Sequence, residues 1–200
     1  PPSPGEDVEF LLTSLLNGIT YGLLLFMLSS GLTLIFSMMS ILNFAHASFY
    51  MLGAYFAYQI STRVGFFPAL LLAPVLVGVV GALVEKHGIR KVHRYGHVAE
   101  LLFTFGLSFL VEEIVHLVWG KAVVDYRVPE SLGGTLFTLY TTTFPAYKGF
   151  MMLVSVAMLA ALYAILTRTR IGLIVQASLT RPDMVEALGH DVPRVFTLVF

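Results

Sequence analysis

A long stretch without charge is the feature that most restricts how this chain can fold. The 53 residues from Phe10 to Thr62 contain no Asp, Glu, Lys or Arg. As a single helix they would extend for about 80 Å at about 1.5 Å per residue, whereas the hydrocarbon core of a bilayer is about 30 Å thick. We therefore expect two membrane spans here, at residues 10–35 and 44–61, joined by an uncharged turn at 37–43.

Apolar segments continue along the rest of the chain. Segments 64–84, 97–119 and 150–167 each have the length of a membrane span. Segment 195–200 begins another apolar run, so we expect about five full spans, the start of a sixth and a missing C-terminal part. Only 12% of the residues are charged, about half the share usual in soluble domains. The prediction is an all-α integral membrane protein, in which residues 10–200 form a polytopic bundle of transmembrane helices.

Positive charges indicate how these spans are oriented. Segments 85–97 and 168–194 together hold eight Lys and Arg residues, whereas the connections on the other side hold four. Cytoplasmic loops of membrane proteins carry an excess of Lys and Arg, so we expect both segments in the cytoplasm. The N-terminal residues 1–9, an acidic tail that we expect to be disordered, then lie outside together with the loop at 120–149.

The 120–149 loop contains strand-forming residues. β-Branched and aromatic side chains predominate at 122–128 and 135–144, and the residues between them, 129–134, include one Pro and two Gly. Two such segments around a Pro/Gly turn are typical of a β-hairpin. We expect a small hairpin in this otherwise helical protein.

Missing features exclude several functional classes. The formal net charge is zero, so no basic face is large enough to make nucleic acid an expected partner. The chain has no cysteine, which removes disulfides, thiolate metal sites and thiol catalysis. It also lacks a nucleotide-binding P-loop, a nucleophile elbow and a His-Glu-x-x-His motif, so we expect neither catalysis nor a cofactor in this chain.

Polar residues interrupt the middle of the uncharged stretch. Non-helical backbone and polar groups at membrane depth persist only where they are buried in protein or line a watery cavity. We therefore expect a translocation path at the joint between the first two spans, lined by Ser40, Asn43, His46 and Ser48. The alternative is that Asn43 and His46, three residues apart, only cap and hold a helix end.

The pattern of residues in the basic segment at 168–194 predicts two short helices. Thr180 to Asp183 has the form of a capping box with Pro in the first turn, and Gly189 is a natural helix stop. We expect the apolar face between them to dock on a protein, because the acidic residues beside it disfavour an anionic membrane surface. The candidate docking residues are Asp183, Met184, Val185, Glu186, Leu188 and Gly189.

Two carboxylates lie deep in the fourth expected span. Glu113 and His116 form a Glu-x-x-His pair beside Glu112, a spacing that ligates iron in helical bundles when a second copy and further carboxylates are present. No such second copy occurs here. We expect these side chains toward the outer surface, where they reach the interface or bond to another helix.

The segment from Gly31 to Tyr55, which includes Asn-Phe-Ala-His-Ala-Ser, resembles the permeases of branched-chain amino-acid ABC importers of the LivH type. Weaker agreement continues at residues 104–108 and 187–189. The family pattern usually has Gly at the position of Ser37 and Gly-Glu at the position of Ala47-Ser48.

The resemblance implies a pore-forming permease subunit of an ATP-binding-cassette importer in the bacterial inner membrane. Its substrates would be branched-chain or other hydrophobic amino acids, with small amides or urea served by relatives. The implied partners are a related permease subunit, two cytoplasmic ATPase subunits that hold ATP and Mg²⁺, and a periplasmic solute-binding protein, with coupling through segment 168–194.

Two other classes remain open. The first is a stand-alone channel or a secondary transporter for a small polar solute such as urea or an amide. A secondary transporter more often buries an ionisable coupling residue in a span, and residues 10–62 offer only His46. The second is an intramembrane enzyme that uses Glu112, Glu113 and His116, for which no complete catalytic constellation is present.

Overall fold

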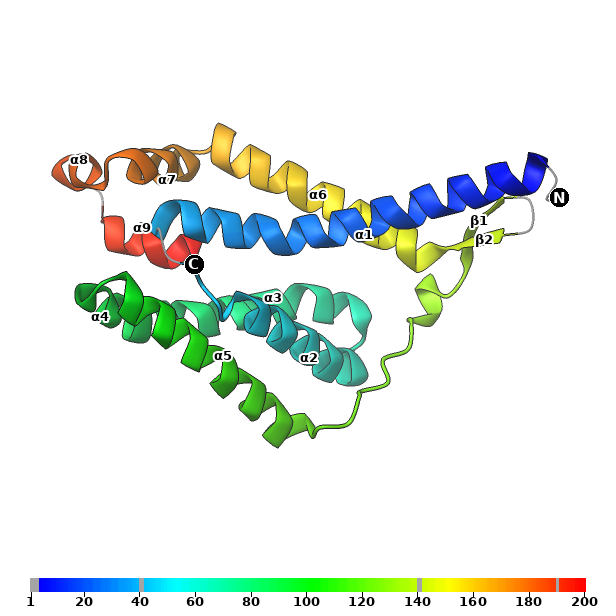
Figure 1. Cartoon of the computed structure of the whole chain (residues 1–200), viewed down its shortest axis with the longest axis horizontal. Coiled ribbons are helices and arrows are strands. Elements are labelled where there is room, and N and C mark those ends of the chain that lie inside the picture. The colour runs from blue at the N-terminus through cyan, green and yellow to red at the C-terminus, as the bar shows by residue number, and fades with distance from the viewer. Residues whose placement is uncertain (1–3, 40–41, 140–141, 190) are drawn as a thin grey trace. The chain divides into compact units, whose positions relative to one another are not determined.

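The structure is a computed structural model that describes residues 4–39, 42–139, 142–189 and 191–200 (Figure 1). The chain divides into two compact units, Pro1–Ser30 with Tyr126–Ile165 and Gly31–Asp125 with Leu166–Phe200. Within the described residues, four helical segments are long and apolar enough to cross a membrane: Asp7–Ser37, Phe66–Tyr95, His97–Trp119 and Ala146–Arg168. An all-α multi-pass membrane protein is therefore confirmed.

These four segments overlap the first, third, fourth and fifth expected spans, and the third continues in helical turns to Tyr95, beyond the expected end at residue 84. The second expected span is helical as well, as α2 (His46–Val64), but it is not among the four. It contains the polar side chains of Gln59, Ser61 and Thr62 toward its C-terminal end. A membrane crossing by α2 stays a prediction.

The first unit contains most of α1 (Pro4–Met39), most of α6 (Ala146–Arg168) and a two-stranded sheet. Lys148 Nζ on α6 donates to Asn17 Oδ1 on α1 over 2.6 Å, and the Ser155 hydroxyl donates to the sulfur of Met27 over 2.9 Å. Helix α1 begins at Pro4, inside the segment for which disorder was expected. Pro at a first helical position, with acidic residues in the first turn, favours helix initiation there.

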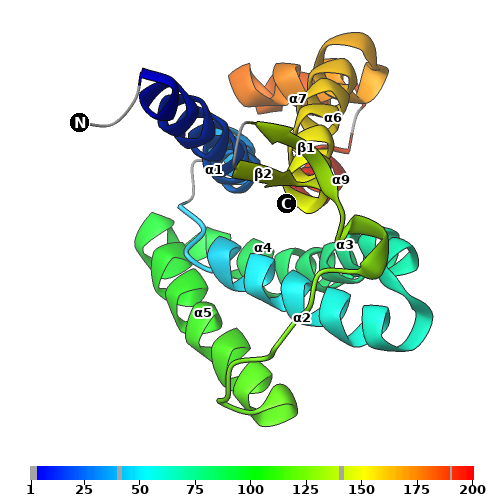
Figure 2. The same cartoon turned by 90° about the vertical axis from the view of Figure 1, so that its right-hand side faces the viewer.

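A small β-hairpin is confirmed, but one of its strands is not where the sequence suggested. The strands are β1 (Thr135–Leu139) and β2 (Thr142–Pro145), which pair antiparallel with Phe137 opposite Phe144 (Figure 2). Residues 122–128 form no strand, and the expected turn contains the 3₁₀ turn η3 (Glu130–Leu132). Segments that lie close together in the sequence pair with less loss of chain entropy than segments that are far apart.

The second unit is built around α2, α3 (Phe66–Val84) and α5 (His97–Trp119). Only Gly65 separates α2 from α3, with a φ of 104° that other residues rarely adopt. Helix α3 continues through the π-helical turn η1 (Glu85–Ile89), α4 (Arg90–Val92) and η2 (His93–Tyr95). The unit also includes three short helices: α7 (Arg170–Thr180), α8 (Pro182–Ala187) and α9 (Val192–Val199).

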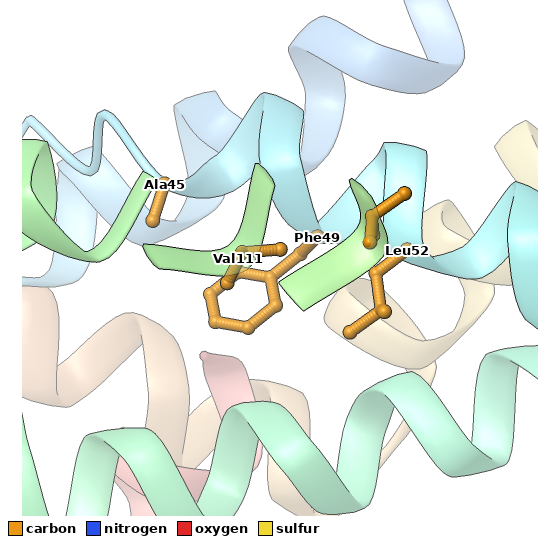
Figure 3. Packing of buried hydrophobic residues seen from close by; sticks show 5 residues of the cluster. Ala45, Phe49, Leu52 and Val111 are labelled. Atoms are coloured by element: carbon orange, nitrogen blue, oxygen red, sulfur yellow. The ribbon is translucent and has the colours of Figure 1, made fainter. Parts of the chain in front are cut away.

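The core of this unit lies between α2 and α5. Its buried residues include Phe49 and Leu52 from α2 and Val111 from α5 (Figure 3). At one end of the pair, the indole N–H of Trp119 donates to Gln59 Oε1 over 3.1 Å. Most other large apolar side chains of the candidate spans are exposed in the isolated chain, as expected for surfaces that contact lipid or other subunits.

Candidate functional site

The break between α1 and α2 lies beside the interior of α5. Thr104, seven residues after the start of α5 and about 10 Å along its axis, places its hydroxyl oxygen 3.5 Å from the carbonyl oxygen of Leu42. The ring of Phe44 meets that of Phe105 edge to face, with centroids 6.0 Å apart. Residues 42–45 are therefore non-helical or turn backbone at the level of a candidate membrane span, where such backbone is found inside protein or beside a watery cavity.

Asn43 holds the turn that leads into α2. Its Oδ1 accepts a hydrogen bond from the backbone N–H of Ala45 over 3.1 Å, and its carbonyl accepts one from His46 over 3.1 Å. These bonds are the helix-end role that the sequence left open as an alternative. The side chain is only 3% exposed, and its Nδ2 has no hydrogen-bond partner within the described residues.

An unpaired buried amide is costly. A buried donor that is left unsatisfied costs about 1–3 kcal/mol, so such a group in a native protein calls for an explanation. A ligand, or a second conformation of the joint, would supply the missing acceptor. Asn43 Nδ2 is therefore a candidate for a group that binds something outside the described residues.

His46 lies against a glycine of α1. A Cβ placed on Gly31 would be 3.0 Å from Cε1 and 3.2 Å from Nε2 of His46, so the imidazole ring occupies space that any larger residue would enter. Ser48 is half-buried in the first turn of the same helix. The structure thus brings Asn43, His46 and Ser48 to one helix start. Ser40 lies outside the described residues, and a path lined by these side chains stays a prediction.

The segment after α6 forms the short helices expected at 168–194. Thr169 caps α7, its hydroxyl oxygen accepting from the N–H of Gly172 over 3.1 Å. The capping box at Thr180 is wrong, because Thr180 is the last residue of α7 and its hydroxyl donates to the carbonyl of Gln176. The helix stop at Gly189 is confirmed by its φ of 86° and by its N–H, which donates to the carbonyl of Glu186.

The expected single apolar face of α8 is divided between two sides. Met184 and Leu188, four residues apart, are 56% and 78% exposed, whereas Val185 is 4% exposed. Met184 precedes Val185 and points about 100° away from it, and helix α8 packs on α7 and α9, so the buried and the exposed side chain lie on different sides of the helix. The exposed surface of α8 therefore consists of Met184 and Leu188 flanked by the exposed carboxylates of Asp183 and Glu186.

Two carboxylates of α5, Glu112 and Glu113, lie toward the C-terminal end of the helix. Glu112 and Glu113 are exposed near the Trp119 end of the helix, and Glu113 Oε1 is 3.8 Å from His116 Nδ1. In the part of the chain that the structure describes, no three His, Cys, Asp or Glu side chains are placed to hold a metal ion.

Sequence reasoning missed two buried carboxylates beside the basic segment. Glu85 is buried at the end of α3 and pairs with Arg90, and Glu100 is fully buried in the first turn of α5. Glu100 Oε1 contacts His93, and its Oε2 lies 3.3 Å from Nδ1 of His97. The available signal was an isolated acidic residue at the border between an apolar run and a basic one.

Comparison with known proteins places the chain in a family. The model of the branched-chain amino acid transport system / permease component matches residues 14–200. The high-affinity branched-chain amino acid transport system permease protein LivH of Escherichia coli K12 is 25% identical over 211 residues, covering 98% of this chain and 67% of the relative. The probable LivH of Methanocaldococcus jannaschii is 28% identical over 193 residues, covering 89% and 58%. No solved structure matches. The chain therefore belongs to the family of branched-chain amino-acid transport permeases and is of the LivH type.

Proposed function

We propose that this chain is a pore-forming permease subunit of an ATP-binding-cassette importer. It carries branched-chain or other hydrophobic amino acids across the bacterial inner membrane, with its N-terminus outside. The observation that supports this most is the family match over residues 14–200 in a chain with four candidate membrane spans. ATP and Mg²⁺ belong to separate cytoplasmic ATPase subunits, and a related permease and a periplasmic solute-binding protein complete the complex.

The break before α2 is the proposed point of contact with the substrate. Transporters commonly bind their substrates where a membrane helix is interrupted, because the ends of helical segments offer unpaired backbone groups there. Asn43 Nδ2 adds a buried side-chain donor without a partner in the described residues. We propose that this amide donates to an acceptor on the passing amino acid, and that Ser40, His46 and Ser48 complete the wall of the path.

The exposed side of α8 is the proposed contact with the ATPase. Met184 of α8 and Leu188, which caps the C-terminal end of this helix just before Gly189, are two exposed apolar side chains four residues apart. Burying each side chain contributes about 1.5–3 kcal/mol, less the ordering costs of association. The carboxylates of Asp183 and Glu186 beside this pair would meet basic groups on the rim of such a groove.

Purification of the full-length protein from membranes in mild detergent tests this proposal. We expect an ATPase subunit and a second permease to co-purify, and ATP hydrolysis by the isolated complex. A protein that purifies without an ATPase, and that still equilibrates leucine or urea across vesicles in the absence of ATP, would instead be a channel or a secondary transporter.

A further inference from the structure

Three polar side chains join α9 to the end of α3. Glu85 is only 1% exposed, and its carboxylate accepts from Arg90 Nε over 3.1 Å and from Arg90 Nη2 over 2.9 Å. The hydroxyl of Thr197 on α9 donates to Glu85 Oε2 over 2.6 Å and accepts from Arg90 Nη2 over 2.6 Å. We name Glu85, Arg90 and Thr197 the Glu85 clasp.

The backbone of η1 makes this clasp possible. Residues five apart in an α-helix point about 140° away from each other, so Glu85 and Arg90 would lie on different sides of a regular helix. A π-helical turn is wider and brings residues five apart together. Glu85–Ile89 forms such a turn, and the two side chains meet. In a regular α-helix over the same residues Glu85 and Arg90 would be separated, so the contact of both with Thr197 depends on the π-helical turn.

An apolar contact lies next to the clasp. The ring of Phe200, which follows α9, meets the ring of Phe49 edge to face, with centroids 6.0 Å apart. A Cβ on Gly81 of α3 would lie 3.6 Å from the same Phe200 ring. Phe49 is one turn after His46, at the start of α2. The C-terminal end of α9 is thus attached both to α3 and to the helix that begins at the proposed substrate contact.

The other end of α9 adjoins the proposed ATPase contact. Helix α9 packs on α7 and on α8, and α8 carries the exposed pair Met184 and Leu188. A displacement of α8 would therefore move α9. The other end of α9 contacts the end of α3 through Thr197 and Glu85, and α2 through Phe200 and Phe49. These contacts form a continuous connection from the exposed side of α8 to the start of α2.

We propose that the Glu85 clasp transmits the movement of α8 to the substrate path, with Thr197 as the positioning residue that fastens α9. This role rests on the proposed function, since it needs an ATPase on α8. It predicts that a variant without the Thr197 hydroxyl still hydrolyses ATP but transports less substrate for each ATP hydrolysed. If the contact only stabilised the complex, its loss would reduce the amount of assembled complex, and ATP hydrolysis and transport would fall together.

The test compares Thr197→Val, which keeps the shape but removes the hydroxyl, with Thr197→Ser, which retains it. Thr62→Val is the matched control, because the hydroxyl of Thr62 is exposed and the bond that it makes among the described residues stays within its own helix, to the carbonyl of Gln59. Each full-length variant is assembled with its partner subunits in proteoliposomes, and leucine uptake and ATP hydrolysis are measured on the same sample. We expect Thr197→Val to hydrolyse ATP but to move on the order of tenfold less leucine per ATP, within the usual range of coupling between sites. Thr197→Ser and Thr62→Val should resemble the wild type.

Equal uptake per ATP in Thr197→Val and Thr62→Val would overturn the proposal. A second measurement uses the unaltered complex and does not depend on the folding of any variant: hydrogen exchange of the amides at 85–92 should change when nucleotide binds. Unchanged exchange there would also overturn the proposal. If the wild-type complex shows no ATP-driven uptake, both the proposed function and the transmission role are refuted. If the wild-type complex transports leucine but Thr197→Val transports as much per ATP as Thr62→Val, only the transmission role is refuted.

Discussion

Replacing Asn43 by Ala should reduce transport while leaving the stability of the protein nearly unchanged. The substitution removes the acceptor for the Ala45 N–H, which costs about 1–3 kcal/mol for a buried donor. It also removes the buried Nδ2, which has no partner in the described residues, and so relieves a penalty of the same size. The net change should stay within about 1–2 kcal/mol, or a few degrees in melting temperature for a chain of this length.

Transport should respond much more strongly. A hydrogen bond from this amide to a charged group on the substrate contributes about 1.5–3 kcal/mol, so its loss should lower leucine uptake by at least about tenfold. Asn43→Asp provides the contrast, because it keeps the acceptor for Ala45 but places a charge at a site that is 3% exposed. Burial of that charge should destabilise the fold by several kcal/mol, and the favourable interaction of the carboxylate with the N-terminus of α2 should offset only about 0.3–1 kcal/mol of this.

Uptake into proteoliposomes and thermal unfolding of the same purified complexes measure the two effects. Asn17→Ala is the matched control. Asn17 and Lys148, which donates to the amide oxygen of Asn17, both belong to the compact unit that does not contain Asn43. Wild-type uptake by Asn43→Ala would refute the substrate contact. A fall in its melting temperature as large as that of Asn43→Asp would show that Asn43 serves only the turn.

A Cβ on Gly88 would lie 2.4 Å from Cζ of Phe103, so the Phe103 ring would have to move to admit a side chain there. Gly88→Ala should therefore destabilise the fold by about 1–3 kcal/mol, measured by thermal unfolding, and Phe103→Leu in the same chain should restore part of this loss. Replacing Met184 and Leu188 together by Asp should release the ATPase in co-purification while the permease stays folded, since both side chains are largely exposed. A cysteine at position 133 should react with an impermeant maleimide on intact spheroplasts, because the loop at 120–149 is expected outside.

Each of these outcomes has its own control. The single variant Phe103→Leu shows how much the smaller side chain itself changes stability. Comparison with the double variant then gives the part that is due to relief of the clash that Gly88→Ala introduces. Val185→Asp, at a residue that is 4% exposed, should disturb the fold rather than the ATPase contact alone. Retention of the ATPase by the double Asp variant would place the docking site elsewhere, for example at 85–97. Labelling of position 133 only after permeabilisation would invert the topology.

The helices could be predicted because each depends on local sequence. Long apolar runs without charge fix the candidate spans, and glycines with positive φ lie where helices were expected to stop, at Gly120 and Gly189. The hairpin was only partly predictable. Both candidate segments were rich in strand formers, and the strand propensities alone did not show that residues 135–139 pair with residues 142–145.

The candidate site was predictable to a smaller extent. Polar residues within an uncharged stretch were enough to single out Asn43 and His46, but the pattern could not show that Nδ2 of Asn43 lacks a partner in the described residues. Nor could helical periodicity assign Val185 to the buried side of α8, because that depends on where α7 and α9 lie. The Glu85 clasp joins residues 112 positions apart through a π-helical turn, which regular helical periodicity does not reveal.

The central claim, that this chain forms part of the pore of an ATP-driven amino-acid importer, is tested most directly by transport in a defined system. The full-length protein, its permease partner, the ATPase subunits and the solute-binding protein are reconstituted in proteoliposomes, and accumulation of radiolabelled leucine is followed. The account predicts accumulation against a gradient that requires ATP and the binding protein and that a non-hydrolysable ATP analogue abolishes. Leucine entry that merely equilibrates, at the same rate with and without ATP, would contradict it.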